Sequence, residues 1–154
     1  MRPGHFSQAG FLGPNESLRH VLDTDARTLG ELGVSASALA GRLAELLETA
    51  IATKRDLGSI DHYRVRVKRY KGPQICPFAP EPHENPCPGY GGMRLASIDW
   101  DIRNTRNRVH LAGPGLIVHL IGMHAFFEGK ESPYRVEPHA LAELLELGLF
   151  APAN

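Results

Sequence analysis

The sequence predicts a single α+β domain, in which an N-terminal helical hairpin packs on a small antiparallel sheet and two further helices follow. Changes of periodicity support this class. Apolar residues recur at helical spacing up to about residue 58, alternate with charged residues over 61–70, and return to helical spacing after Pro114. The 154 residues suit about one domain, which we divide into subregions 1–58, 59–129 and 130–154.

Two amphipathic helices are predicted in the first subregion. The first spans 16–32, with Asn15 as its N-cap and Gly33 as its stop. The second follows Ser35, a residue type that caps helices well. Its apolar stripe consists of Leu39, Leu43, Leu46, Leu47 and Ile51. Neither helix carries a pattern of side chains typical of a reaction.

The second subregion contains the predicted strands. Over 63–68, apolar residues alternate with Arg and Lys, which predicts a strand with one buried face and one basic face. Alternation over 98–103, a polar turn at 104–107 and the apolar residues Val109 and Leu111 predict a hairpin. A Pro-rich loop of unusual length, from Gly72 to about Gly92, separates the first strand from this hairpin.

Two helices are predicted after the hairpin. Gly113-Pro114-Gly115 opens the first, which runs to about Met123 or His124, with Pro in its first turn. The second begins at Pro138 and runs to Gly148.

One set of side chains suggests chemistry. Cys76 and Cys87 lie in the long loop, and His119 and His124 lie on the helix after the hairpin. Two thiolates and two imidazoles form tetrahedral zinc sites, so the set is similar to a Cys2His2 site in ligand type. The spacing between the histidines is usual for such sites, whereas ten residues between the cysteines is long. Because positions five apart on a helix point about 140° from one another, we expect the helix to tighten or unwind near Gly122.

A bound ion would also explain how the long loop is ordered. The loop offers few apolar anchors, namely Ile75, Phe78 and Met93, so burial alone does little to offset its ordering entropy. Thiolates clamped on zinc would offset that entropy directly. We therefore favour a small zinc-binding protein with a structural site, acting as a binding or regulatory module and not as an enzyme.

Three alternatives remain open. A disulfide between Cys76 and Cys87 could replace the metal. A metal-dependent hydrolase could bind zinc through His83, His119 and His124 with one position open, and Glu84 or Glu128 would be the base on the zinc-bound water, although the motif His-Glu-x-x-His is absent. A metal-free interaction domain is the third reading.

Charge indicates no general attraction to nucleic acid or to an acidic membrane. Seventeen basic residues balance seventeen acidic ones, but 61–110 carries nine basic against five acidic residues. Nucleic acid could bind a basic face formed by 64–71 and 94–108, yet the helix after the hairpin offers no basic or amide side chain for base recognition. We favour a solvated face kept charged against pairing between sheet edges, with Asp99 and Asp101 in salt bridges.

Other function classes find no support in the sequence. The longest apolar run, Leu116 to Phe127, is too short to cross a bilayer. The N-terminus lacks the pattern of an export signal, so we expect a soluble cytoplasmic protein whose cysteines stay reduced. Phosphate-binding glycine loops and a Gly-x-Ser-x-Gly motif are absent. The partner is not specified.

Overall fold

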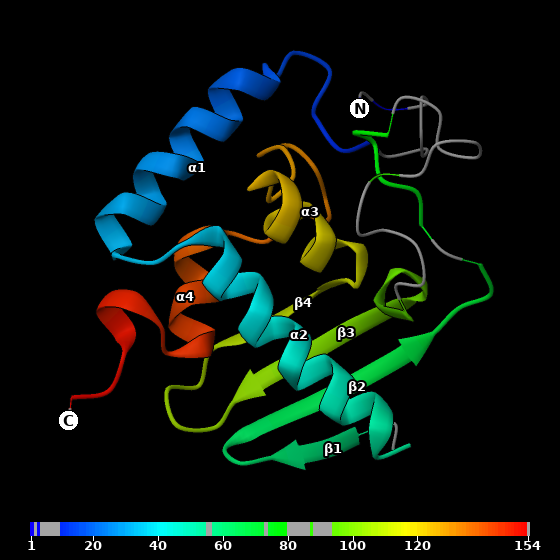
Figure 1. The fold of residues 1–154 in the computed structure, drawn as a ribbon, viewed down its shortest axis with the longest axis vertical. Coiled ribbons are helices and arrows are strands. Elements are labelled where there is room, and N and C mark those ends of the chain that lie inside the picture. The colour runs from blue at the N-terminus through cyan, green and yellow to red at the C-terminus, as the bar shows by residue number, and fades with distance from the viewer. Residues whose placement is uncertain are drawn as a thin grey trace.

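The computed structural model describes residues 1, 3, 10–54, 57–72, 74–79, 87 and 94–153. Within these residues the chain forms four α-helices and a four-stranded antiparallel sheet, which confirms the predicted α+β class (Figure 1). Two helices precede the sheet and two follow it. No helix in the described ranges has the length and apolar character needed to cross a bilayer.

The two N-terminal helices form where apolar spacing predicts them. Helix α1 spans Leu18–Leu32 and ends at Gly33, which adopts the left-handed conformation that glycine tolerates. Its N-cap is Ser17 and not Asn15, because the Ser17 side chain accepts a hydrogen bond from the backbone of His20. Helix α2 spans Ala36–Ala52 and is capped by Ser35 as predicted.

The sheet has the order β1-β2-β3-β4, with every neighbouring pair antiparallel. Strand β1 (Leu57–Ile60) was not predicted, because four residues with mixed exposure give no clear alternation. Strand β2 (Tyr63–Arg69) has the expected alternation of buried and exposed residues. Strands β3 (Ile98–Asn104) and β4 (His110–Pro114) form the predicted hairpin, and the short helix η1 (Arg94–Ser97) precedes β3.

Of the last two helices, α3 begins later than the sequence predicts and α4 ends earlier. Helix α3 spans Leu116–His124, and Pro114 belongs to β4 instead of the helix's first turn. Helix α4 spans Pro138–Leu145 with Pro138 at its start. It ends before Gly148, which begins the short helix η2 (Gly148–Phe150).

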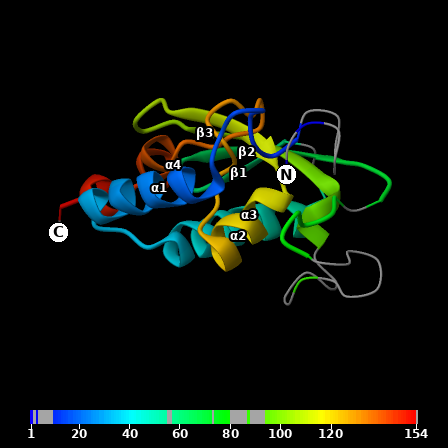
Figure 2. The same cartoon turned by 90° about the horizontal axis from the view of Figure 1, so that it is seen from above.

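Helices cover one face of the sheet, and charged side chains of β2 are exposed on the other face. Helix α2 packs against β1, β2 and α3, whereas α1 packs mainly against α4 (Figure 2). The core lies between these helices and the inner face of the sheet, where Tyr63, Val65, Trp100 and Ile102 are buried. Residues at the alternate positions of β2 point away from the helices and are exposed.

Candidate metal centre

The structure brings the four predicted side chains into one cluster. Cys76, Cys87, His119 and His124 each offer one ligand atom, and these atoms all lie within 4.8 Å of one another. The cysteines come from the segments before and after 80–86, and the histidines come from α3. These four residues form a buried group that could hold a metal ion, and we call them the Cys/His cluster.

Helix α3 presents both imidazoles without unwinding. The helix stays regular through His124, and Ala125 closes it in the left-handed conformation. The two rings reach a centroid separation of 5.2 Å with their planes 76° apart. The expected distortion at Gly122 is therefore absent, and this glycine serves packing instead. A Cβ atom there would lie 3.2 Å from the Cβ of Ala40 on α2, so glycine allows the two helices to approach closely.

The imidazole of His124 lies between the two thiols. Its Nε2 atom is 3.5 Å from the Sγ atom of Cys76 and 3.2 Å from that of Cys87. The ring of Phe78 stacks on the His124 ring at a centroid distance of 4.1 Å, and it meets Phe126 edge-on at 5.4 Å. Phe78 thereby fixes the plane of one candidate ligand. Sequence reasoning treated Phe78 only as an apolar anchor, and its place two residues after Cys76 was the available signal.

Burial controls the charge of the cluster. It raises the pKa of the Cys76 thiol to about 11, and the neighbouring Cys87 adds to this rise, although backbone hydrogen bonds from Phe78 and Ala79 oppose it. Burial also lowers the pKa of His119 and of His124. The histidines are therefore neutral near pH 7, which is the form of imidazole that binds metals. The cluster as a whole carries no positive charge that would repel a cation.

The alternatives to a four-ligand metal site depend on a disulfide or on other side chains. Both cysteines are free thiols in the structure, and no disulfide joins them. His83 and Glu84 lie outside the described residues, as does most of the predicted loop beyond Ala79. Glu128 is buried and accepts a hydrogen bond from the hydroxyl of Ser132. Among the described residues, the cluster includes no carboxylate.

The predicted basic face is present on the open side of the sheet. Arg64, Arg66 and Lys68 are exposed on β2, and Arg103 is exposed on β3. Protection against pairing between sheet edges does not explain these charges, because β2 and β3 are the central strands. Asp101 pairs with His110 at 2.8 Å, and Asp99 accepts a hydrogen bond from the Tyr70 hydroxyl at 2.9 Å. The side chain of Arg94 lies outside the described residues.

No family model, no curated protein and no solved structure matches the chain. No relative therefore supplies a function. What the cluster can do follows from its donor set, which is two thiols and two imidazoles within reach of one ion.

Proposed function

We propose that the protein is a zinc-stabilised binding module in which Cys76, Cys87, His119 and His124 hold a structural zinc ion. The observation that carries the proposal is the convergence of all four ligand atoms within 4.8 Å. Two sulfur and two nitrogen donors are a combination that selects zinc over magnesium or calcium, which prefer oxygen. The thiols must stay reduced, so the proposal includes a reducing compartment such as the cytoplasm.

Geometry supports a tetrahedral ion. With Zn–N near 2.0 Å and Zn–S near 2.3 Å, a nitrogen and a sulfur on one tetrahedral zinc lie about 3.6 Å apart. The separations from His124 Nε2 to the two sulfur atoms, 3.5 Å and 3.2 Å, are close to this value. These two separations support an ion shared by His124 and both thiolates.

The donor set favours a structural role over hydrolysis. Four protein ligands fill a tetrahedral shell, so no position is left for the activated water that a zinc hydrolase needs. Among the described residues, no carboxylate belongs to the cluster and could act as a base. The carboxylate of Glu128 accepts a hydrogen bond from Ser132 instead. When bound, the ion would cross-link the segment around Cys76 and Cys87 to the end of α3.

Metal content and cobalt spectroscopy test the proposal. Protein purified without chelator is expected to contain one equivalent of zinc, and the cobalt-substituted form is expected to show thiolate charge-transfer bands and tetrahedral d–d absorption. Cys76→Ser and His124→Ala should each lose the metal. His20→Ala is the matched control, because His20 is exposed on α1 and should keep the full equivalent.

Three results would contradict a structural zinc site. Wild-type protein without stoichiometric zinc would remove the ion altogether. A full equivalent retained by Cys76→Ser would remove the thiolate ligand. Five-coordinate cobalt spectra without thiolate bands would replace the closed site by a catalytic one.

A further inference from the structure

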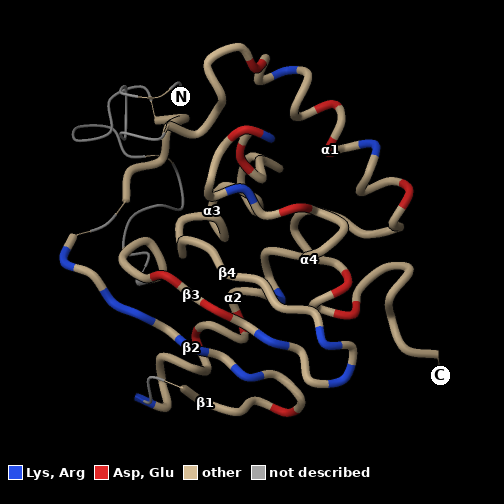
Figure 3. The backbone as a smooth tube through the Cα atoms, turned by 180° about the vertical axis from the view of Figure 1, so that it is seen from behind, with Lys and Arg blue, Asp and Glu red and all other residues tan. Residues whose placement is uncertain are grey.

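The open face of the sheet carries a row of cations along its central strands. Side chains at alternate positions of β2 point away from the core, and these are Arg64, Arg66 and Lys68. Strand β3 adds Arg103, and the turn after it adds Arg108. Lys and Arg follow β2 and gather at the turn between β3 and β4, where Figure 3 shows them in blue. This surface, which we call the arginine face, lies across the sheet from α2 and α3.

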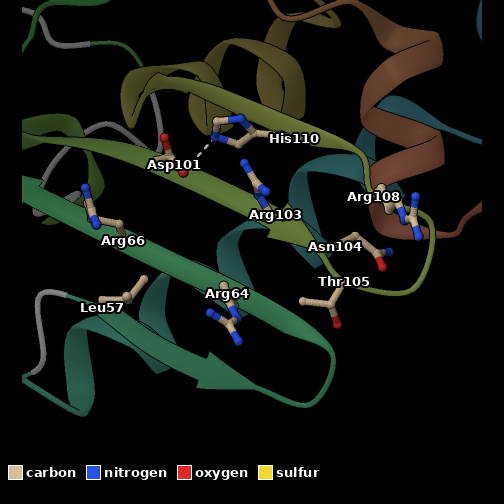
Figure 4. Close-up of a pocket in the computed structure, with 9 residues that line it drawn as sticks. All are labelled: Leu57, Arg64, Arg66, Asp101, Arg103, Asn104, Thr105, Arg108 and His110. Atoms are coloured by element: carbon tan, nitrogen blue, oxygen red, sulfur yellow. Dashed lines mark hydrogen bonds and ion pairs between the residues drawn. The ribbon is translucent and has the colours of Figure 1, made fainter.

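The arginines of this face have no ion-pair partner within the part of the chain that the structure describes. Among the described residues, the guanidinium groups of Arg64, Arg66, Arg103 and Arg108 form no ion pair, whereas other arginines do. Arg106, in the same turn as Arg108, pairs with Glu146. The nearest carboxylate on the face, Asp101, is engaged by His110 (Figure 4). Several charges are thus left for an external anion.

The register of the sheet places two cations of this face opposite each other, whereas Arg66 and Lys68 lie opposite Asp101 and Asp99. Arg64 on β2 lies directly opposite Arg103 on β3. Like charges at directly opposed positions destabilise a sheet, so this pair lowers fold stability. Because β2 and β3 are paired on both sides, the two arginines are also not needed to block edge pairing. An anion bound between them would offset their repulsion.

The arginines surround a hollow that a ligand could occupy. A depression of about 620 Å³ lies on this face, lined by Arg64, Arg66, Arg103 and Arg108 together with Asp101 and His110. Figure 4 shows the arginines spread over β2, β3 and the following turn. Guanidinium groups bind phosphate oxygens through two parallel hydrogen bonds, which makes phosphate a well-matched anion.

Aromatic surface continues the row at the other end of β2. Tyr70 and Tyr134 are about half exposed, at 48% and 52%, and line a second depression of about 380 Å³ together with Lys71. The ammonium of Lys68 lies 5.3 Å from the centroid of the Tyr70 ring. Arg64 and Tyr70 are six positions apart along extended chain, so the row is about 20 Å long.

We propose that the arginine face and Tyr70 bind single-stranded nucleic acid, which lies along β2. Its phosphates face the arginines, and its bases stack at the tyrosine end, because cationic grooves with aromatic platforms bind single strands in this way. A row of about 20 Å is longer than one phosphate group, which favours a linear polyanion over a small ligand. The helices lie behind the sheet, so the face has no helix to enter the major groove of a duplex.

This proposal goes beyond the zinc site and concerns a different surface. The two fail separately. Zinc-loaded protein that does not bind a single strand would contradict only the arginine face, and protein that contains no zinc when purified without chelator but binds a single strand would contradict only the zinc site. Zinc content is therefore measured on the same preparations.

Fluorescence anisotropy with labelled oligo-dT and oligo-U of about 12 nucleotides tests the proposal, since single-strand sites span about 4 to 16 nucleotides. Binding in the micromolar range is expected at about 50 mM salt, and it should weaken steeply as salt rises. Arg64→Ala combined with Arg103→Ala should weaken binding at least about tenfold, because two charged contacts are lost. Tyr70→Ala should weaken it about fivefold or more through lost stacking.

The control removes the same charge from α1, which packs mainly against α4 and not against the sheet. Arg19→Ala combined with Arg27→Ala alters exposed residues of α1 and should leave the affinity unchanged. Circular dichroism checks that each variant is folded. Absence of binding, equal loss in the control, equal affinity for a duplex of the same length, or displacement by inorganic phosphate at the same phosphate concentration would each overturn the proposal.

Discussion

Glu128 is a carboxyl group held in the protein interior without a counter-ion on its side chain. It is 1% exposed, and burial raises its pKa from 4.5 to about 7, although the hydrogen bond from Ser132 opposes this rise. Arg135 lies nearby but donates to the backbone carbonyl of Glu128 at 2.6 Å, and its guanidinium pairs with Asp25 on α1. The proton on Glu128 is therefore held more tightly in the folded state than in the unfolded state.

This difference predicts that stability falls with rising pH. Folding takes up a proton at Glu128 between pH 4.5 and about 7, so the contribution of Glu128 to the free energy of unfolding should decrease across this window and level off above it. At about 1.4 kcal/mol for each unit of pKa, the decrease is at most about 3 kcal/mol. In Glu128→Gln this component should vanish. Urea unfolding of both proteins from pH 4 to pH 8 measures it, and parallel curves for the two would contradict the prediction.

Residue types with strong chemistry could be predicted from the sequence, but their partners could not. Two thiols and two imidazoles are recognisable as zinc ligands by residue type, even though the spacing of the cysteines is long, so the members of the Cys/His cluster could be predicted from the sequence. The ion pair between Asp25 and Arg135 joins residues 110 positions apart, and no local pattern signals it. The same holds for the contact of Phe78 with His124, which needs the loop to return to α3.

Helices and strands could be predicted where the periodic pattern of apolar residues extends over many residues, and not where it covers only a few. Helices α1 and α2 each contain several turns of apolar spacing, and β2 and β3 are each seven residues long, of which at least six alternate. Strand β1 has only four residues and depends on its pairing with β2. The packing of α1 against α4 was also unpredictable, because periodicity identifies an apolar stripe and not the element that covers it.

The start of α3 depends on the absence of a side chain at Gly115. A Cβ atom at this position would collide with the carbonyl oxygen of Leu95 in η1, and the backbone N–H of Gly115 donates to Ile98 at 2.8 Å. The close approach fixes where the histidine-bearing helix begins relative to β3. A larger residue would have to displace either α3 or η1.

We therefore predict that Gly115→Ala lowers the free energy of unfolding by about 1 to 3 kcal/mol, as overpacking does. Gly30→Ala is the matched control. A Cβ atom on Gly30 of α1 meets nothing within 4 Å, so this change should raise the free energy of unfolding by about 0.5 to 1 kcal/mol through helix propensity. Urea denaturation of both variants gives the comparison. Equal effects with the same sign would show that the contact with Leu95 does not constrain α3.

At the scale of the whole molecule, the sequence predicts the four residues that the proposed zinc ion would join, but not how the elements that carry them pack. The two cysteines lie where few apolar residues could anchor the chain, and the two histidines lie on a helix buried in the core. This contrast predicts that a bound ion would cross-link the loop to the helix. In the structure, this cross-link would join the cysteine-bearing segment to α3, the helix that packs against α2.

Removing zinc should therefore loosen one part of the molecule more than the rest. In the segment 74–79, the backbone N–H of Gln74 donates to Ala96 at 2.8 Å and that of Ala79 donates to Cys76 at 3.2 Å. These amides depend on the position of Cys76, so they should exchange with deuterium much faster in chelator-treated protein. Amides of α1, such as that of Val21, which donates to Ser17 at 3.0 Å, should change less.

The same treatment should lower the midpoint of thermal unfolding, because an ion that binds only the folded state stabilises it by mass action. At a zinc concentration about a thousand times the dissociation constant, the stabilisation is about 4 kcal/mol. Adding zinc back should restore both the midpoint and the slow exchange of Gln74 and Ala79, whereas magnesium should restore neither, since it prefers oxygen ligands. Unchanged exchange at these two amides after complete removal of zinc would mean that packing, including the stack of Phe78 on His124, orders the segment without the ion.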